Sequence, residues 1–181
     1  MSTAKETQPS LDYLRELDGE VQLLNHTAAT LAWDQETYMP EGAVNERAQQ
    51  LALMQTLIHD RMTSDEVGRR LEDLGATDEQ PMGDPGLADE DRRFLRQIQR
   101  EYRRGSRLSR ELVREFAETT SKAQSVWVKA RGEDDFSQFA PHLKRIVELN
   151  REMAERIGYE DHPYDALMDA FEPFMRTPRV K

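Results

Sequence analysis

The sequence predicts an all-α protein, an antiparallel helical bundle of about six to seven helices without a significant sheet. Apolar residues recur at steps of three and four in several long segments, and no segment sustains the period-two alternation of a strand. Clusters of Gly and Pro separate the periodic segments. The 181 residues suffice for one sizeable domain. We expect residues 1–9 to form a disordered tail and residues 10–181 a single helical domain.

The first half of the chain predicts three helices. The first runs over residues 10–32, capped by its opening serine. Its apolar residues lie on one stripe: Leu14, Leu17, Val21, Leu24, Ala28 and Leu31. The pattern breaks at residues 33–42, where we expect a connection. A second helix follows over residues 43–62, and a capping box that starts at Thr63 opens a short third helix ending at Gly75.

The second half begins with a Pro- and Gly-rich loop at residues 76–87. A helix from Asp89 to Gly105 follows, and then a long helix over residues 109–130. The next helix begins at Asp134 or Asp135, ends at Gly158 and carries one apolar stripe: Phe136, Phe139, Leu143, Ile146, Asn150, Met153 and Ile157. A last short helix is expected over residues 165–171.

Composition excludes several function classes. The 35 acidic and 25 basic residues give a net charge of −10, which argues against a nucleic-acid surface and against an anionic membrane. The absence of cysteine excludes disulfides and thiolate metal sites. The polar N-terminus does not resemble a signal peptide, and no apolar run approaches the roughly 20 residues of a membrane span. We therefore expect a cytoplasmic protein.

The histidines offer no local metal motif. No two of them lie four residues apart, and there is no His-Glu-x-x-His; they are His26, His59, His142 and His162. A metal site assembled across the fold stays open as the less favoured alternative. The acidic run Glu133-Asp134-Asp135 is interpreted as a helix cap rather than as a cation site.

The segment Thr30–Pro40 contains one of the two tryptophans beside two carboxylates. Trp33 either plugs the helix ends or forms part of a cleft wall, and we favour the plug, partly buried against the stripe around Leu31. Asp34 and Glu36 are candidates for an acid/base pair or for capping and hydrogen-bond contacts. The residues alone leave this choice open.

Three stretches resemble conserved segments of the Taq-type zinc metallocarboxypeptidases, the thermostable carboxypeptidase 1 family. The first is Leu-Ala-Trp-Asp-Gln-Glu-Thr-Tyr-Met-Pro at residues 31–40. The second is the Trp-Val-Lys-Ala-Arg stretch that continues to Leu over residues 127–143, and the third is Pro-Tyr-Asp-Ala-Leu-Met-Asp-Ala-Phe-Glu-Pro over residues 163–173. All three occur in the family's order, so the chain is identified as the N-terminal region of such a protein.

The resemblance implies an all-helical, cytosolic, often dimeric enzyme that removes C-terminal amino acids from peptides. In that family His-Glu-x-x-His and a downstream Glu hold zinc, and the motif's Glu is the general base. This motif does not occur in the 181 residues, so we expect no catalytic residue, metal ligand or cofactor in the chain. The family-signature residues are candidates for a cleft wall or a structural role: Trp33, Asp34, Glu36, Met39, Pro40, Trp127, Arg131, Tyr164 and Asp165.

Two departures limit the transfer of roles. The Gly that usually follows Glu-Pro is replaced by Phe174, so the last turn is expected to differ. His162 belongs to the Pro-Tyr-Asp segment and not to the family's later His-Pro-Phe motif, so it receives no active-site role.

Two functional hypotheses follow. The first is an N-terminal carboxypeptidase region, from a truncated gene or an artificial fragment, which is inactive alone and meets peptide substrate only in the full-length context. The alternative is a stand-alone helical interaction or dimerisation module without catalysis, for which a homodimer is the expected assembly. Substrate preference and the origin of the short chain are left open.

Overall fold

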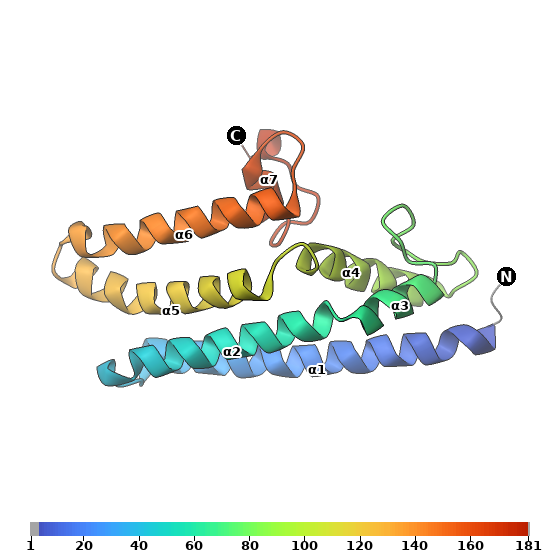
Figure 1. The fold of residues 1–181 in the computed structure, drawn as a ribbon, viewed down its shortest axis with the longest axis horizontal. Coiled ribbons are helices and arrows are strands. Elements are labelled where there is room, and N and C mark those ends of the chain that lie inside the picture. The colour runs from blue at the N-terminus through green and yellow to red at the C-terminus, as the bar shows by residue number, and fades with distance from the viewer. Residues whose placement is uncertain (1–3, 181) are drawn as a thin grey trace. The chain divides into compact units, whose positions relative to one another are not determined.

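The structure is a computed structural model that describes residues 4–180. Within that range the chain forms helices joined by turns and loops, and it contains no strand (Figure 1). The helices are α1 (Ala4–Thr37), α2 (Val44–Met62), α3 (Asp65–Asp73), α4 (Asp89–Gly105), α5 (Arg110–Gly132), α6 (Phe136–Ile157) and α7 (Pro163–Met168). Two short 3-10 turns, η1 (Glu41–Ala43) and η2 (Thr177–Arg179), complete the set. The all-α prediction with six to seven helices is confirmed.

The described residues form two compact units. Unit 1 comprises the chain up to Thr30 together with Met54–Ser106, and unit 2 comprises Leu31–Leu53 together with the chain from Arg107 onward. The boundaries fall inside α1 and α2. The single domain over residues 10–181 stays a prediction, and each unit is described by itself.

The first helix begins earlier than the sequence predicts. Residues 4–9 are helical and not a tail, while residues 1–3 lie outside the described residues. Pro9 lies inside the helix, where it removes one backbone donor. The side chains of Thr7 and Ser10 are nevertheless buried, and Ser10 Oγ donates to Asp73 Oδ2 at 3.1 Å. These anchors hold the helix across the proline.

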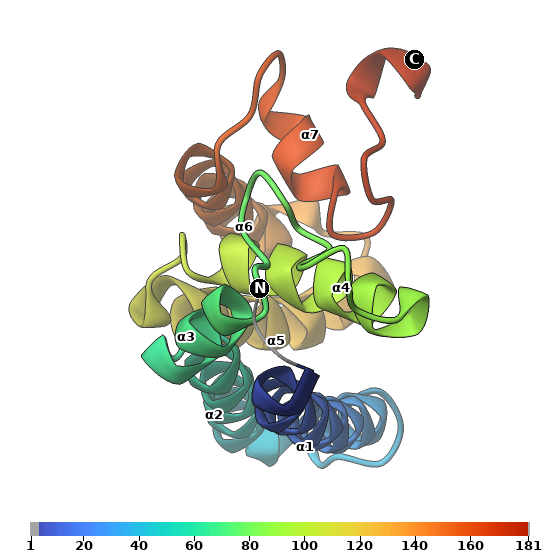
Figure 2. The same cartoon turned by 90° about the vertical axis from the view of Figure 1, so that its right-hand side faces the viewer.

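Unit 1 is built around one apolar core. The α1 stripe packs against α3, α4 and the end of α2 through buried side chains that include Leu11, Leu14, Leu17, Val21, Met62, Val67, Leu71, Leu74, Leu95 and Ile98. Each fully buried leucine stabilises the fold by about 1.5–3 kcal/mol. Within this unit α1 and the end of α2 lie side by side in both views (Figures 1 and 2), where Arg61 pairs with Glu20 at 3.6 Å.

The Pro- and Gly-rich connection of unit 1 is a loop, as predicted. Gly83 has a φ of +69° and lies directly against Leu74 O, where a Cβ would approach to 2.7 Å. Both the positive φ and the close approach require glycine here. The loop therefore folds back over the end of α3 because of one residue.

Serine and aspartate caps fix three helix starts. Ser64 Oγ accepts from Val67 N at 3.5 Å, Ser109 Oγ from Leu112 N at 3.3 Å, and Asp135 Oδ1 from Ser137 N at 3.0 Å. The cap of α3 lies one residue later than the capping box predicts, because Thr63 instead donates to His59 O at 2.8 Å. Such caps typically contribute about 1 kcal/mol each.

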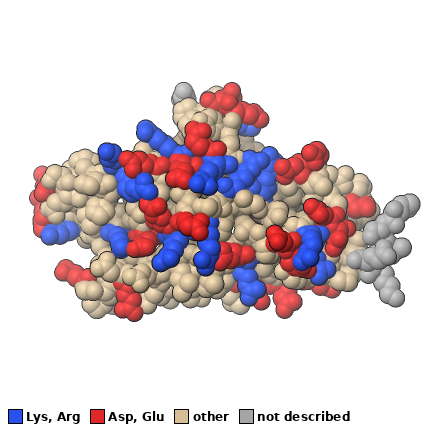
Figure 3. Space-filling model, in the orientation of Figure 1, with Lys and Arg blue, Asp and Glu red and all other residues tan. Residues whose placement is uncertain are grey.

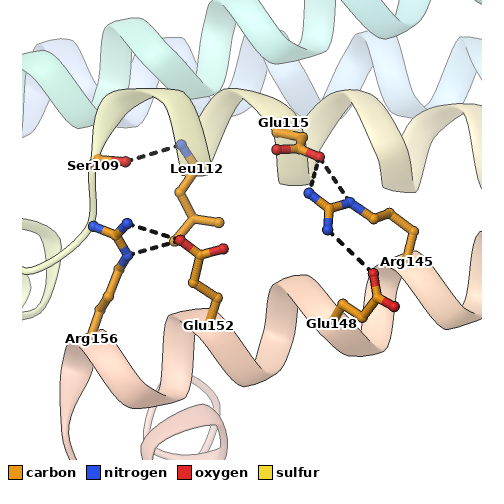
Figure 4. Close-up of polar contacts among 7 residues, drawn as sticks. All are labelled: Ser109, Leu112, Glu115, Arg145, Glu148, Glu152 and Arg156. Atoms are coloured by element: carbon orange, nitrogen blue, oxygen red, sulfur yellow. Dashed lines mark hydrogen bonds and ion pairs between the residues drawn. The ribbon is translucent and has the colours of Figure 1, made fainter.

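In unit 2, α5 and α6 form an antiparallel hairpin. Arg145 of α6 reaches across to Glu115 of α5, with its Nε at 2.9 Å from Glu115 Oε1 (Figure 4). The hydrogen bonds that Arg145 donates to Glu115 and Glu148 raise the pKa of its guanidinium above the ordinary value. Basic and acidic side chains are interspersed rather than segregated on the face drawn in Figure 3.

The end of α6 supports the last helix. Ala154 and Ile157 pack against Ala166 of α7, with Leu108 and Leu167 beside them. The short helix begins at Pro163 and ends at Met168, earlier at both ends than the predicted range 165–171. Across residues 4–180, no helix combines the length and the apolar character needed to span a bilayer.

Candidate functional site

The signature segment at residues 31–40 continues α1 for two more turns instead of forming a connection. The helix ends at Thr37, and Tyr38 N and Met39 N donate to Asp34 O at 3.0 and 2.9 Å. Pro40 then adopts an extended backbone and precedes η1. The residue before a proline avoids the helical conformation, so Pro40 accounts for the helix end. The break that was predicted at residues 33–42 thus lies at residues 38–43, of which 41–43 form η1.

Trp33 is not a plug. It is 58% exposed, and its ring meets the Tyr38 ring edge-on, with ring centroids 5.5 Å apart. The expectation that it packs against the Leu31 stripe is wrong. Because α1 continues as a helix, Trp33 lies about 200° around the axis from Gln35, the residue that faces α5. The indole therefore lies on the outer side of α1.

Asp34 is held by Arg47 of α2. Arg47 Nη2 lies 2.6 Å from Asp34 Oδ2, and the Arg47 side chain is only 13% exposed. The same guanidinium donates to Leu31 O and to Gln50 Oε1. The hydrogen-bond expectation for Asp34 is confirmed, and the charge pair joins the end of α1 to α2.

Glu36 behaves differently from Asp34. It is exposed, and within residues 4–180 its side chain makes no hydrogen bond or ion pair. The expected contact of Glu36 is therefore wrong. Residues two positions apart on a helix, such as Asp34 and Glu36, point about 200° apart around the axis. Glu36 therefore points away from Arg47.

Trp127 and Arg131 lie one turn apart near the end of α5. The Arg131 guanidinium carbon lies 5.8 Å from the Trp127 ring centroid, in a cation–π arrangement. Both side chains are exposed. This pair covers the last turn of α5 and presents a flat aromatic surface beside a fixed positive charge.

Tyr164 and Asp165 occupy the start of α7. His162 caps this helix, with Nδ1 accepting from Tyr164 N at 3.1 Å. Asp165 is 4% exposed, and its Oδ1 accepts from Thr177 N at 2.7 Å and from the Thr177 hydroxyl. These hydrogen bonds from Thr177 lower the pKa of the Asp165 carboxyl, and Arg176 and His162 lower it further. Asp165 thus anchors the segment that follows α7, while Tyr164 is exposed.

The nine signature residues lie in three segments of unit 2. One segment lies at the end of α1, one at the end of α5 and one in α7, which follows the far end of α6 (Figure 1). The 22 residues of α6 rise roughly 33 Å at 1.5 Å per residue, and this helix lies between Arg131 and Asp165 in the chain.

The described residues do not fit a zinc ion. A zinc site needs at least three protein ligands within bonding reach. No group of three His, Cys, Asp or Glu side chains with that arrangement occurs among the side chains that the structure describes, those of residues 7–180. His162 Nδ1 is committed to the cap of α7, and His26 is exposed. No catalytic step through zinc is therefore assigned to these residues.

Sequence reasoning missed two side chains that shape this region. Gln35 bonds with Ser121 of α5, and Arg47 bonds with Asp34. Gln35 continues the stripe of Ala28 and Leu31 at steps of three and four, which is the signal that marks it as inward-facing. For Arg47 no local pattern gives a signal, because its partners Asp34 and Leu31 lie on another helix.

Comparison with known proteins gives consistent matches. A family model described as Carboxypeptidase Taq (M32) metallopeptidase matches residues 13–181. Thermostable carboxypeptidase 1 of Pyrococcus furiosus is 34% identical over 158 residues, which cover 87% of this chain and 30% of that protein. Thermostable carboxypeptidase 1 of Thermus thermophilus is 34% identical over 175 residues, which cover 91% of this chain and 33% of that protein.

A solved structure matches as well. The crystal structure called BsuCP superposes with a TM-score of 0.85 at 26% identity and covers 95% of this chain and 33% of the other. The chain therefore spans about a third of the length of the relatives it matches.

Proposed function

Because the chain belongs to the carboxypeptidase Taq (M32) metallopeptidase family, we propose that it is the N-terminal helical region of a zinc-dependent carboxypeptidase. Such an enzyme removes C-terminal amino acids from peptides. The observation that carries the proposal is the family match over residues 13–181, which leaves only the first turns of α1 outside it. The three signature segments at residues 31–40, 127–143 and 163–173 lie within the matched range.

In this proposal the metal-binding half of the enzyme lies in the part of the relatives that the chain does not match. Support comes from the side chains that the structure describes, among which no three His, Asp or Glu are placed to hold a metal ion. Support also comes from the length of the relatives, of which about a third is matched. The contribution of this chain is then a scaffold: the Gln35–Ser121 and Asp34–Arg47 contacts hold the end of α1 against α5 and α2.

The proposal predicts that the purified chain alone is inactive. After dialysis against zinc, elemental analysis is expected to find far less than one zinc per chain, and incubation with a short peptide is expected to leave its C-terminus intact. Stoichiometric zinc together with stepwise loss of C-terminal residues would contradict the inactive-region proposal.

The second candidate is a stand-alone helical interaction module. The observation that favours it is the exposed aromatic pair Trp33 and Tyr38 at the end of α1, since exposed apolar clusters commonly mark interaction surfaces. Static light scattering distinguishes the two candidates. A dimer whose mass falls to that of a monomer in Trp33→Ser supports the module, and a wild-type monomer at high concentration counts against it.

A further inference from the structure

One face of α6 carries a heptad-like seam. Its members follow steps of four and three without interruption: Phe136, Ala140, Leu143, Val147, Asn150, Ala154 and Ile157. This spacing is typical of helices that pack lengthwise against another helix, because it keeps the apolar positions on one line. We call these seven positions the α6 seam.

Only one end of the α6 seam is covered. Ala154 and Ile157 are buried under α7, where they pack against Ala166. Toward the start of the helix the side chains are open: Phe136 is 64% exposed, Leu143 38% and Val147 40%. The same line of residues is thus an established helix–helix interface at one end and an unpartnered apolar face at the other.

The open part has the dimensions of a helix contact. From Phe136 to Asn150 it rises roughly 21 Å, or about four helical turns. Asn150 does not interrupt it with an unmet polar group, because its Nδ2 donates to Ile146 O at 2.9 Å within the same helix. Charged side chains flank the seam: Lys144 and Arg151 are exposed on one side, and Arg145 is engaged with Glu115 on the other.

We propose that the open α6 seam is the docking surface for one amphipathic helix from the part of the carboxypeptidase fold that lies outside the matched third. This rests on the proposed function. Two observations select the occupant. The seam continues the α6–α7 interface, so the next helix is expected to extend that packing, and the relatives have about twice as much chain again from which to supply it.

A second copy of the chain fits the seam less well. Because α7 covers Ala154 and Ile157, two α6 helices could meet only along the open positions from Phe136 to Asn150. That is at most five positions per copy, whereas stable dimers bury about 800 Å² and 20–30 residues on each side. A helix that belongs to a larger polypeptide does not need so large an area on the seam, because contacts elsewhere between the two polypeptides also contribute to binding.

The absence of cysteine allows a direct test. Val147→Cys places a unique thiol on the seam, and Lys144→Cys places one on the exposed helix surface about 100° around the axis from Leu143. Each is labelled with a polarity-sensitive fluorophore. The probe added is the unmatched two thirds of Thermus thermophilus thermostable carboxypeptidase 1, produced as a separate polypeptide. We expect a blue shift at position 147 that saturates at one equivalent, and no shift at position 144.

Competition with unlabelled chain adds a second measurement. Val147→Glu would bury an unpaired charge, so it should compete at least about tenfold more weakly than Lys144→Glu, which keeps the seam intact. Matching circular dichroism spectra and melting temperatures for the two variants show that both are folded. An unchanged emission at position 147, equal shifts at both positions, or equal competition by both variants would overturn the proposal.

The experiment also separates the seam from the proposed function. A shift at position 147 that grows with the concentration of the chain alone, without the added polypeptide, would assign the seam to a second copy and overturn the chosen occupant. Peptide trimming by the mixture without a shift at position 147 refutes the seam and leaves the proposed function intact. A shift without trimming supports the seam and counts against the function.

Discussion

Gln35 and Ser121 exchange two hydrogen bonds between the end of α1 and the middle of α5. Gln35 Nε2 donates to Ser121 O at 2.8 Å, and Ser121 Oγ donates to Gln35 Oε1 at 2.8 Å. Ser121 is buried, so water does not easily replace either partner. This reciprocal contact is the polar connection that holds the family-signature segment in place within unit 2.

Ser121→Ala should therefore destabilise the chain by about 1–3 kcal/mol, because it leaves the Gln35 amide oxygen without a donor in a largely buried place. Urea unfolding measures this cost, and Ser125→Ala on the same helix serves as the control. A double-mutant cycle with Gln35→Leu should give a coupling energy of roughly 0.5–3 kcal/mol. Additive effects of the two substitutions would show that the exchange contributes nothing of its own.

Replacing Phe174 by glycine is expected to stabilise the chain. It has a φ of +66°, in the left-handed region that costs a non-glycine residue roughly 1–2 kcal/mol, and its side chain is 63% exposed. The backbone is held there by a hydrogen bond from Phe174 N to Asp169 Oδ1 at 2.8 Å. Phe174→Gly removes the strain but adds unfolded-state entropy of about 0.4–1 kcal/mol, so a net gain of up to about 1 kcal/mol is expected.

Phe171→Gly is the matched control for that substitution, since Phe171 is also exposed but has no positive φ. It should lower the melting temperature. If Phe174→Gly lowers it equally, the left-handed conformation is not the determining feature of this turn.

Substitution of Glu101 in unit 1 is expected to change the melting temperature in a pH-dependent way. Burial raises the pKa of the Glu101 carboxyl, and the nearby Asp18 carboxylate raises it further. A carboxyl whose folded pKa lies above its unfolded value contributes stability below the unfolded pKa, and this contribution is lost as pH rises through the folded pKa. Glu101→Gln should therefore raise the melting temperature at pH 7 but hardly at pH 4. Exposed Glu16 gives the control variant, Glu16→Gln, which should show no such difference between the two pH values.

The contribution of Asp165 to the stability of unit 2 is expected to depend on pH in the opposite direction. The hydrogen bonds from Thr177 hold the pKa of Asp165 below its ordinary value, so its contribution is present above the unfolded pKa and is lost as pH falls through the folded pKa. Thr177→Val should raise the pKa of Asp165, which carboxyl-carbon NMR titration would detect. The pKa of Asp135, lowered by Ser137 and Gln138, provides an internal reference that should not move.

Local patterns were sufficient to predict most of the fold. The steps of three and four along Leu14, Leu17 and Val21 correctly predicted the buried face of α1, and Gly105 and Gly158 were correctly predicted to end helices. Boundaries failed where distant contacts decide them. Residues 4–9 are helical, and just after them Ser10 bonds with Asp73, which lies 63 residues away in the chain.

The contacts of the candidate site were harder to predict from the sequence than the helices. An unusual Trp beside two carboxylates suggested a plug, but burial of Trp33 depends on which side of α1 meets α5, and Gln35 determines that side. Asp34 was correctly expected to form a polar contact, while its partner Arg47 comes from another helix and leaves no trace in the local pattern. The family segments identified the protein class without showing which side chains their residues contact.

The most direct test of the proposed function is a reconstitution measurement. The purified chain is mixed with the unmatched two thirds of Thermus thermophilus thermostable carboxypeptidase 1, and zinc content and release of C-terminal amino acids are measured for each part and for the mixture. We predict that zinc remains with the added polypeptide, that this chain alone neither holds zinc nor trims peptide, and that the mixture trims faster than either part. Zinc bound stoichiometrically by this chain alone, with trimming activity, would contradict the account.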